Sequence, residues 1–209
     1  MQYIKKRLDI TMEKVYCREL DIPVGQIILG AMGGKLCLCD WKNSKRREQN
    51  ANRIKRLQKA ELVDITSVQE KPELLAEASA LQDSLSILDK TEKELAEYFA
   101  GSRKSFDIPL LLVGTDFQKS VWQVLREIPY GEVVSYMEVS QSIGNPQAIR
   151  AVSQAIGSNP LSILIPCHRV VGSNGALTGY AGGIEVKRCL LELEKGQEKG
   201  KKNSKCLVM

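Results

Sequence analysis

The sequence predicts an α/β (α+β) protein in two parts, an N-terminal part with a small sheet and helices and a C-terminal part that is mainly helical. Three observations predict this fold class. Two apolar runs joined by glycines occur early in the chain, apolar residues recur at helical spacing in its middle, and two short helical patterns around a glycine precede an apolar run that leads to Cys167. We place the domain boundary near Gly114, which divides the chain into residues 1–113, 114–196 and a polar, basic tail at 197–209.

The composition is that of an ordinary globular protein. Of the 209 residues, 43% are hydrophobic and 26% are charged, which indicates neither a disordered chain nor a fibre. No apolar run approaches the ~18 residues that cross a bilayer, and the N-terminus is not followed by an apolar signal core. The six cysteines show no close CxxC spacing, which is typical of free thiols in a reducing compartment. We therefore expect a cytoplasmic protein, or a nuclear one in a eukaryote, that does not act at a membrane.

Positive charge is concentrated in one stretch. The net charge is +5, and residues 42–59 hold eight lysines and arginines against the single acid Glu48. A basic stretch of this kind either contacts phosphate groups or forms a solvated face. We interpret it as a solvated face.

Residues 23–41 predict a β-hairpin. The apolar segments 24–30 and 36–41 flank two glycines, which supply the backbone angles of a tight turn. Cys37 and Cys39 are two positions apart, so on a strand they point to the same face. Because no histidine is near them in the sequence, we interpret them as half-buried strand residues and not as metal ligands.

Helical patterns follow the hairpin. Residues 46–62 are polar with sparse apolar positions and predict a surface helix or a mobile loop. Pro72 can open an amphipathic helix whose apolar stripe runs to Leu88. A capping box at Thr91 predicts that a second helix starts there and ends at Gly101.

The C-terminal part contains a helix followed by a helix-turn-helix outline. After the extended segment 106–113, Asp116 is expected to cap the first helix. A capping box at Ser135 starts a short helix that Gly144 closes, and Asn145 is expected to cap the next helix, with a proline at its first position. Two short helices joined by a tight glycine turn are typical of DNA-binding motifs.

The second helix of this outline is suited to close approach to a groove. It is rich in alanine and carries a single arginine, Arg150, with small neighbours. Residues 157–160 end this helix, and a final helix at 184–195 closes the C-terminal part.

Cys167 is the candidate nucleophile. The apolar run 161–165 predicts a strand that leads into Cys167, and His168, the only histidine in the chain, follows directly. A cysteine is a useful nucleophile only as the thiolate, so it needs a base or a positive neighbour. Successive side chains of a strand point to opposite faces, so we expect His168 to act through a water or across a turn. As a base it needs a carboxylate to hold its tautomer. The candidates on the closing helix are Glu185, Glu192 and Glu194. The alternative interpretation is an inert buried thiol.

The segment Pro-Cys-His-Arg-Val at 166–170 resembles the active-site signature of the O6-alkylguanine-DNA alkyltransferases, also called methylated-DNA–protein-cysteine methyltransferases. The resemblance runs from about Tyr98 to Glu194, nearly half of the chain, and reaches the N-terminal third only weakly, through the hairpin. Further blocks typical of the family follow in the same order: Tyr98-Phe99-Ala100-Gly101, Phe106-Asp107, Phe117-Gln118, Val121-Trp122, Ile128-Pro129-Tyr130-Gly131, Val134-Ser135-Tyr136, Gly144-Asn145-Pro146, Arg150-Ala151-Val152, Asn159-Pro160 and Gly182-Gly183.

The resemblance implies a ribonuclease H-like N-terminal domain and a winged-helix-like C-terminal domain that binds DNA and carries the active cysteine. It implies a DNA repair protein that flips O6-alkylguanine, and O4-alkylthymine, out of duplex DNA and transfers the alkyl group irreversibly to its own cysteine, once per molecule. No cofactor is implied. The implied partner is double-stranded DNA, bound through the minor groove by a monomer.

The resemblance assigns catalytic roles to five residues. Cys167 is the implied nucleophile, and His168 is expected to take its proton through a water. Glu194 is expected to orient the imidazole. Asn159 would tie the cysteine-bearing segment to the preceding helix, and Tyr136 would crowd the phosphate of the flipped nucleotide and donate a hydrogen bond to the base.

Substrate and DNA contacts are implied for a second group. Arg150 is expected to fill the place that the flipped base leaves, and Tyr180 to line the pocket. The backbone around Val170 and Ala181 is expected to read the guanine edge, and Lys187 is a further candidate near the pocket. The other implied contacts on the DNA-facing helix are Gln147, Ala151 and Ser153.

Two features depart from the family's pattern or leave it open. Some members bind a structural zinc through two cysteines and two histidines, and with His168 as the only histidine we expect no metal site here. Ala181 and Ser162 occupy positions that leave the preference between methyl and bulkier groups open. The competing interpretations are a non-catalytic lesion-binding protein of the same fold and an unrelated cysteine hydrolase or DNA-binding regulator.

Overall fold

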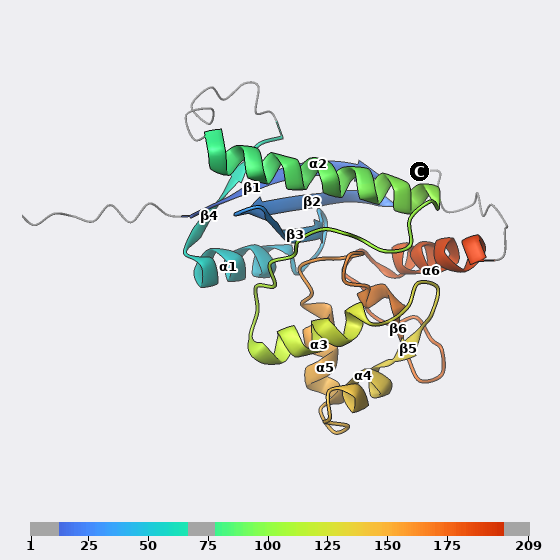
Figure 1. Cartoon of the computed structure of the whole chain (residues 1–209). Coiled ribbons are helices and arrows are strands. Elements are labelled where there is room, and N and C mark those ends of the chain that lie inside the picture. The colour runs from blue at the N-terminus through green and yellow to red at the C-terminus, as the bar shows by residue number, and fades with distance from the viewer. Residues whose placement is uncertain (1–12, 67–77, 199–209) are drawn as a thin grey trace, which may run out of the picture.

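The computed structural model describes residues 13–66 and 78–198, and its N-terminal part is built on one sheet. The strands are β1 (Glu13–Ile22), β2 (Gly25–Met32), β3 (Lys35–Trp41) and β4 (Ala60–Asp64). Their order in the sheet is β3-β2-β1-β4, with antiparallel pairing between β1, β2 and β3 and a parallel pairing between β1 and β4 (Figure 1).

The expected hairpin is confirmed as β2 and β3. Gly33 and Gly34 join them with φ angles of 54° and 67°, which glycine adopts without strain. Cys37 and Cys39 lie on β3 and are fully buried, not half-buried as expected, because the sheet is covered on both sides. Strands β1 and β4 were not predicted. Strand β4 is short and pairs with a segment far away in the sequence, so no local pattern marks it.

Two helices cover the sheet. Helix α2 (Ala78–Ala100) lies across one face, and α1 (Arg47–Gln58) lies on the other side (Figure 1). The predicted restart of a helix at Thr91 is wrong, because α2 runs through this position without a break. Thr91 is buried and its hydroxyl donates to the carbonyl of Ile87 at 2.7 Å, so it is satisfied inside the helix and caps nothing. The expected helix start at Pro72 lies outside the described residues.

The C-terminal part is mainly helical. Its elements are α3 (Asp116–Arg126), β5 (Val134–Ser135), α4 (Tyr136–Ser142), α5 (Ile149–Gly157), β6 (Val170–Val171) and α6 (Ile184–Glu198), with β5 parallel to β6. The predicted capping box at Ser135 is confirmed. Helix α3 is capped by Thr115 and not by Asp116, because Thr115 and Gln118 form a reciprocal capping box one residue earlier. The predicted fold class, a sheet domain followed by a mainly helical domain, is confirmed.

The predicted cap at Asn145 is wrong. Helix α5 starts only after Ala148, which makes no side-chain cap. The carbonyl of Asn145 accepts the Ala148 amide at 3.0 Å and the hydroxyl of Ser140 at 2.6 Å. These bonds hold residues 145–148 in a turn before the helix begins.

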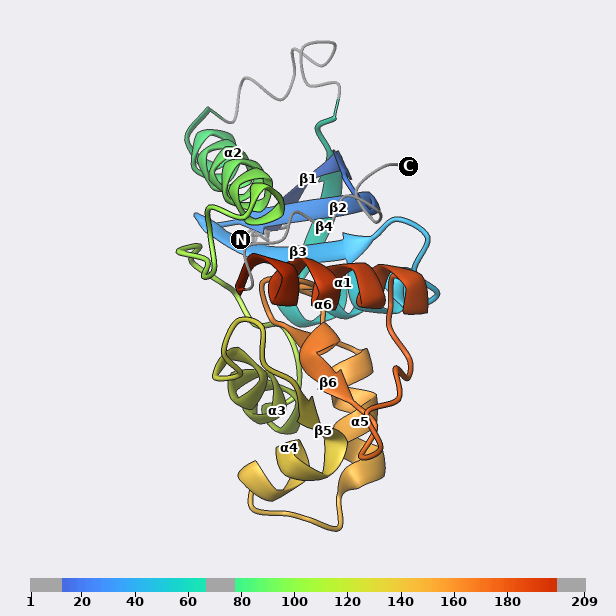
Figure 2. The same cartoon turned by 90° about the vertical axis from the view of Figure 1, so that its right-hand side faces the viewer.

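The two parts share their packing. The main hydrophobic cluster of the described residues draws on both, with Trp41 from β3, Leu161 and Leu190 among its members. Backbone bonds join β3 to the C-terminal part, from Cys39 N to Pro160 O at 2.8 Å and from Ser162 N to Cys39 O at 2.7 Å. Helix α6 lies between the sheet and the other C-terminal helices (Figure 2). Among the helices of residues 13–66 and 78–198, none has the length and apolarity that a membrane crossing requires.

Candidate active site

Cys167 lies in a short 3-10 turn, Cys167–Arg169, and not on a strand. The predicted strand at 161–165 is wrong, because Ile165 N donates to Leu161 O at 2.8 Å and closes a tight turn around Ile163. Ile163 has a φ angle of 71°, a conformation that costs a β-branched residue energy and that surrounding packing must hold. The alternation of strand side chains therefore does not govern how Cys167 and His168 are placed.

Asn159 connects the end of α5 to the cysteine. Its Nδ2 donates to Ile165 O at 2.9 Å and to the sulfur of Cys167 at 3.3 Å, while its Oδ1 accepts the Leu161 amide at 3.0 Å. One buried side chain thus fixes the turn before the cysteine and supplies a hydrogen bond to the sulfur. The structure brings Asn159 and Cys167 together as the sequence suggested.

The Cys167 thiol is protonated in the resting protein. It is 6% exposed, and burial raises its pKa to about 11, although the Asn159 hydrogen bond and the charge of Lys187 lower it. The pKa values of Cys17 and Cys37 are raised further by burial, to about 12. Cys167 thus has the lowest raised pKa of these three cysteines, but it still needs a base to become a thiolate.

His168 is oriented by Glu194. Its Nε2 lies 2.9 Å from Glu194 Oε1, and both side chains are fully buried. Because the carboxylate can only accept, Nε2 carries the proton and Nδ1 presents its lone pair. Nδ1 is buried and has no hydrogen-bonding partner among the described residues. Burial lowers the pKa of His168, so the imidazole is neutral at pH 7 and its Nδ1 can accept a proton.

Glu194 is held by more than His168. Its Oε1 also accepts from the hydroxyl of Tyr98 at 2.7 Å and from Arg169 Nη2 at 2.9 Å. Its Oε2 accepts from Arg169 Nε at 3.0 Å and from the Gly131 amide at 3.1 Å. Burial by itself raises the pKa of Glu194, but the bonds and charges of His168 and Arg169 outweigh it and hold that pKa well below its usual range. Glu194 therefore stays ionised.

The other carboxylates suggested for this role do not hold the imidazole. Glu185 is exposed at the start of α6 and pairs with Arg188. Glu192 is half-buried on the same helix. His168 donates its hydrogen bond to Glu194, the last of the three along α6.

A pocket of about 750 Å³ lies where the two parts meet. Four of the predicted site residues line it: Tyr136, Ser153, Tyr180 and Ala181. The Tyr180 ring lies edge-on to His168, with ring centroids 6.4 Å apart, and Cys167 lies outside the lining. Trp41 of β3 closes the pocket from the N-terminal part and packs edge-on against Tyr180 at 5.9 Å. A Cβ on Gly182 would lie 2.7 Å from the Trp41 ring, so only glycine fits there.

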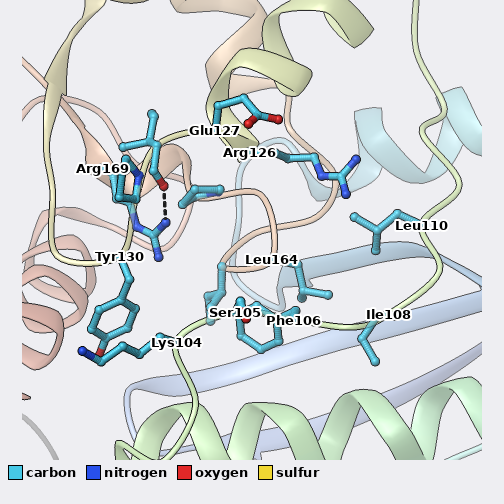
Figure 3. Close-up of a pocket in the computed structure, with 14 residues that line it drawn as sticks. Lys104, Ser105, Phe106, Ile108, Leu110, Arg126, Glu127, Tyr130, Leu164 and Arg169 are labelled. Atoms are coloured by element: carbon cyan, nitrogen blue, oxygen red, sulfur yellow. Dashed lines mark hydrogen bonds between the residues drawn. The ribbon is translucent and has the colours of Figure 1, made fainter.

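A second pocket lies on the reverse side of the cysteine turn. It has a volume of about 280 Å³, and Lys104, Arg126 and Tyr130 line it together with Arg169 (Figure 3). The dashed line in Figure 3 is the bond from Arg169 Nη1 to the carbonyl of Ile128, at 2.6 Å. The Arg169 side chain thus bonds both to the segment that follows α3 and to Glu194, which holds the cysteine turn in place.

Helix α5 presents the predicted DNA-contacting residues on its free side. Arg150 and Ala151 are exposed, as is Gln147 just before the helix. The opposite side is buried, and the Trp122 indole of α3 donates to the carbonyl of Ala155 at 2.8 Å. Ser153 lies between these sides and lines the pocket, so α5 connects the exposed surface to the pocket.

Lys187 bonds to two backbone carbonyls, one of them that of Val170. Lys187 is fully buried, and its Nζ donates to the carbonyls of Val170 at 2.6 Å and Thr178 at 2.8 Å. Its ammonium thus links the loop before α6 to β6, and its expected part in substrate binding stays a prediction. The Thr178 hydroxyl in turn donates to the hydroxyl of Tyr136 at 3.2 Å.

Most basic side chains of residues 42–59 are exposed, as a solvated face requires, but Arg53 packs against the end of α5. Arg53 donates from Nη2 to Ser158 O at 2.8 Å and stacks over Trp122 at 5.3 Å. The guanidinium of Arg46 lies beside Gly157, and Arg46 lines the pocket. Sequence patterns did not identify Trp41, Tyr98 or Arg46 as site residues, because only the tertiary fold brings Trp41 and Arg46 to the pocket and Tyr98 to Glu194. In the part of the chain that the structure describes, no three His, Cys, Asp or Glu residues are grouped to hold a metal ion.

Comparisons with known proteins agree over nearly the whole chain. Residues 116–196 match the family described as 6-O-methylguanine DNA methyltransferase, DNA binding domain, and residues 15–112 match its ribonuclease-like domain. The methylated-DNA–protein-cysteine methyltransferase of Mycobacterium leprae is 39% identical over 88% of this chain and 94% of the relative. The protein of that name from Methanosarcina acetivorans is 55% identical over 50% of this chain and 67% of the relative.

Solved structures show the same likeness. The crystal structure of Mycobacterium tuberculosis OGT in complex with DNA superposes with a TM-score of 0.67 and 38% identity, over 88% of this chain and 94% of that chain. Mycobacterium tuberculosis O6-methylguanine methyltransferase gives the same TM-score of 0.67 at 37% identity, again over 88% of this chain and 94% of that chain. On these matches the chain belongs to the 6-O-methylguanine DNA methyltransferase family.

Proposed function

We propose that Cys167 is the residue that takes the alkyl group from O6-alkylguanine in DNA. The chain is a DNA repair methyltransferase of a family whose members transfer alkyl groups to a cysteine. One observation carries the assignment to Cys167. Its sulfur accepts a hydrogen bond from Asn159, and the residue next to it is a buried neutral histidine held by an ionised carboxylate. No other cysteine of the described residues has a histidine beside it.

The proposed chemistry is a single displacement. His168 Nδ1 takes the thiol proton through a water, and Glu194 stabilises the imidazolium that forms. The Cys167 thiolate attacks the alkyl carbon, so an S–C bond forms as the C–O6 bond breaks and guanine leaves with the electron pair and regains a proton. The product is a thioether, which has no easy leaving group. Each molecule therefore reacts once, and the chemistry calls for no cofactor.

Access to the lesion requires base flipping. The O6 group is stacked inside duplex DNA, and extruding the nucleotide costs a few kcal/mol. Arg150 and Ala151 are both exposed on α5. In this proposal Arg150 enters the stack that the base leaves, and the small Ala151 permits close approach to the minor groove. Tyr136 lines the pocket, and its proposed role is to crowd the phosphate of the flipped nucleotide and to donate a hydrogen bond to the base. We propose that one molecule binds DNA in this way as a monomer.

The pocket is the proposed binding place of the flipped base. Tyr180 and Ala181 line it, and in this proposal the backbone near Val170 and Ala181 reads the edge of guanine. The same pocket would accept O4-alkylthymine, which presents an alkylated oxygen on a smaller ring.

Intact-mass measurement tests this proposal. The protein is incubated with duplex DNA containing O6-methylguanine, and we expect a gain of one methyl mass, located on Cys167 by peptide mapping. Cys167→Ser should gain nothing. The matched control is Cys189→Ser, which removes the half-exposed cysteine of α6 and should leave methylation unchanged. Methylation on another cysteine, or repeated turnover by one molecule, would refute the assignment. Tight binding without any adduct would favour the alternative, a non-catalytic lesion-binding protein.

A further inference from the structure

Glu194 receives a hydrogen bond from the N-terminal part of the protein. Tyr98 is a fully buried residue near the end of α2, and its hydroxyl donates to Glu194 Oε1 at 2.7 Å. The same oxygen receives His168 Nε2 at 2.9 Å. A helix that packs on the sheet therefore reaches the carboxylate that orients the histidine beside Cys167.

A donor on this oxygen affects the histidine as well as the carboxylate. A proton on His168 is stabilised by the negative charge on Glu194, and a hydroxyl that donates to the same oxygen withdraws part of that charge. Burial and the neighbouring Glu194 raise the pKa of Tyr98 well above its usual value, so the hydroxyl stays a donor throughout the working pH range. Its effect on His168 is therefore constant with pH.

We propose that Tyr98 is a positioning residue for His168, whose hydroxyl fixes the Glu194 oxygen that faces the imidazole and limits how strongly that oxygen attracts an imidazole proton. For alkyl transfer this rests on the proposed function, in which His168 is the base. A base that Glu194 made too basic would already be protonated at neutral pH and could not accept the thiol proton. Tyr98 keeps the imidazole free for that step.

Other charged and titratable groups around His168 also set its protonation. Helix α6 contributes Glu194 and Lys187, the turn contributes Arg169, and the loop before α6 contributes Tyr180. Burial and the charges of Arg169 and Lys187 lower the pKa of His168, and Glu194 raises it. All of these groups belong to the C-terminal part, whereas Tyr98 contacts Glu194 from the N-terminal part.

The variant Tyr98→Phe isolates the hydroxyl. The ring packs against Phe99, Phe106 and Tyr130 at centroid distances of 5.3, 5.5 and 6.0 Å, and phenylalanine keeps these contacts. Glu194 also keeps its four other hydrogen bonds in this variant. We therefore expect a folded protein. The matched control is Tyr16→Phe, which removes the hydroxyl of a buried tyrosine on β1.

Nuclear magnetic resonance reads the effect directly, because the chain contains a single histidine. With isotope-labelled histidine, we expect the pKa of His168 in Tyr98→Phe to rise by about half a unit or more over the unaltered protein. Tyr16→Phe should leave it unchanged. Equal His168 pKa values in all three proteins would overturn the proposal, as would an equal rise in both variants.

Single-turnover alkyl transfer supplies the second readout. The acidic limb of its pH profile should move to higher pH in Tyr98→Phe by the same amount as the His168 pKa, whereas a purely structural role would lower stability and leave the limb in place. If the unaltered protein transfers no alkyl group, the proposed function fails. The resonance titration still decides whether Tyr98 controls His168.

Discussion

Replacing Glu194 with glutamine disturbs the hydrogen bonds that orient His168 beside Cys167. The carboxylate accepts five hydrogen bonds, three on Oε1 from Tyr98, His168 and Arg169 and two on Oε2 from Arg169 and Gly131. An amide has one acceptor oxygen and one NH2 group. Whichever way glutamine is oriented, its NH2 group faces at least two donors, and the Arg169 charge loses its counter-ion.

The size of the loss follows from burial. Removing one partner of a buried ion pair costs about 3–5 kcal/mol, because the other charge remains buried. For a chain of this size, each kcal/mol lowers Tm by roughly 2–4 °C, so Glu194→Gln should lower Tm by about 6–20 °C. The imidazolium that forms during transfer also loses its counter-charge, so transfer should slow by about 100-fold.

Thermal unfolding and single-turnover transfer to the protein from duplex DNA measure both effects. The matched control is Glu185→Gln on the same helix, where the carboxylate is exposed and pairs with Arg188. Surface pairs contribute little, so this variant should change Tm by no more than about 2 °C. If the two variants share the same Tm and the same transfer rate, Glu194 does not anchor the site and the reasoning is refuted.

Three further outcomes are expected. Arg150→Ala should slow repair of duplex DNA by about tenfold or more but leave reaction with the free alkylated base unchanged, because only the duplex needs flipping; equal slowing would give Arg150 another role. Gly182→Ala should lower the unfolding free energy measured in urea by about 1–3 kcal/mol, because its Cβ would lie 2.7 Å from Trp41; an unchanged midpoint would contradict this contact. Acidification should destabilise the protein as pH falls below 6.5 and again below 4.5, because the folded-state pKa values of His168 and Glu194 are lowered from these values and the unfolded chain binds protons first. A flat unfolding free energy between about pH 7.5 and pH 5.5 would contradict the burial of neutral His168.

The fold could be predicted where a few adjacent residues encode an element. The β2–β3 turn needs two glycines with positive φ, and the start of α4 needs the Ser135 capping box, so both are visible in the sequence. Thr91 and Asn145 are residue types that often cap helices, but neither does so here. The Thr91 hydroxyl bonds to a carbonyl inside α2, and Asn145 lies in a turn before α5. Burial decides between these outcomes, and burial is a property of the tertiary structure.

Local patterns alone could predict the site only as far as its contiguous motif. Cys167 and His168 are adjacent in the sequence, and the position of Glu194 follows from the family resemblance. Tyr98 is 96 residues from Glu194 in the sequence. Only the packing of α2 against the C-terminal part brings them into contact. The prediction of a strand before Cys167 was wrong for a related reason. No local pattern indicates that Ile163 adopts the left-handed conformation that turns the chain.

The raised pKa of Cys167 is compatible with its proposed role as nucleophile. A thiolate that persisted in the resting protein would react with oxidants and adventitious electrophiles, and a protein that reacts once would be lost to each such event. Burial keeps the Cys167 thiol protonated, so its proton must pass to His168, the neutral base next to it. Glu194 already contacts His168 and stabilises the positive charge that the imidazole then carries. Burial raises the pKa of the Cys167 thiol, whereas the Asn159 hydrogen bond and the Lys187 charge lower it. These two contacts therefore stabilise the thiolate when it forms. The burial that suppresses reactivity at rest also excludes water during transfer, which strengthens these same contacts.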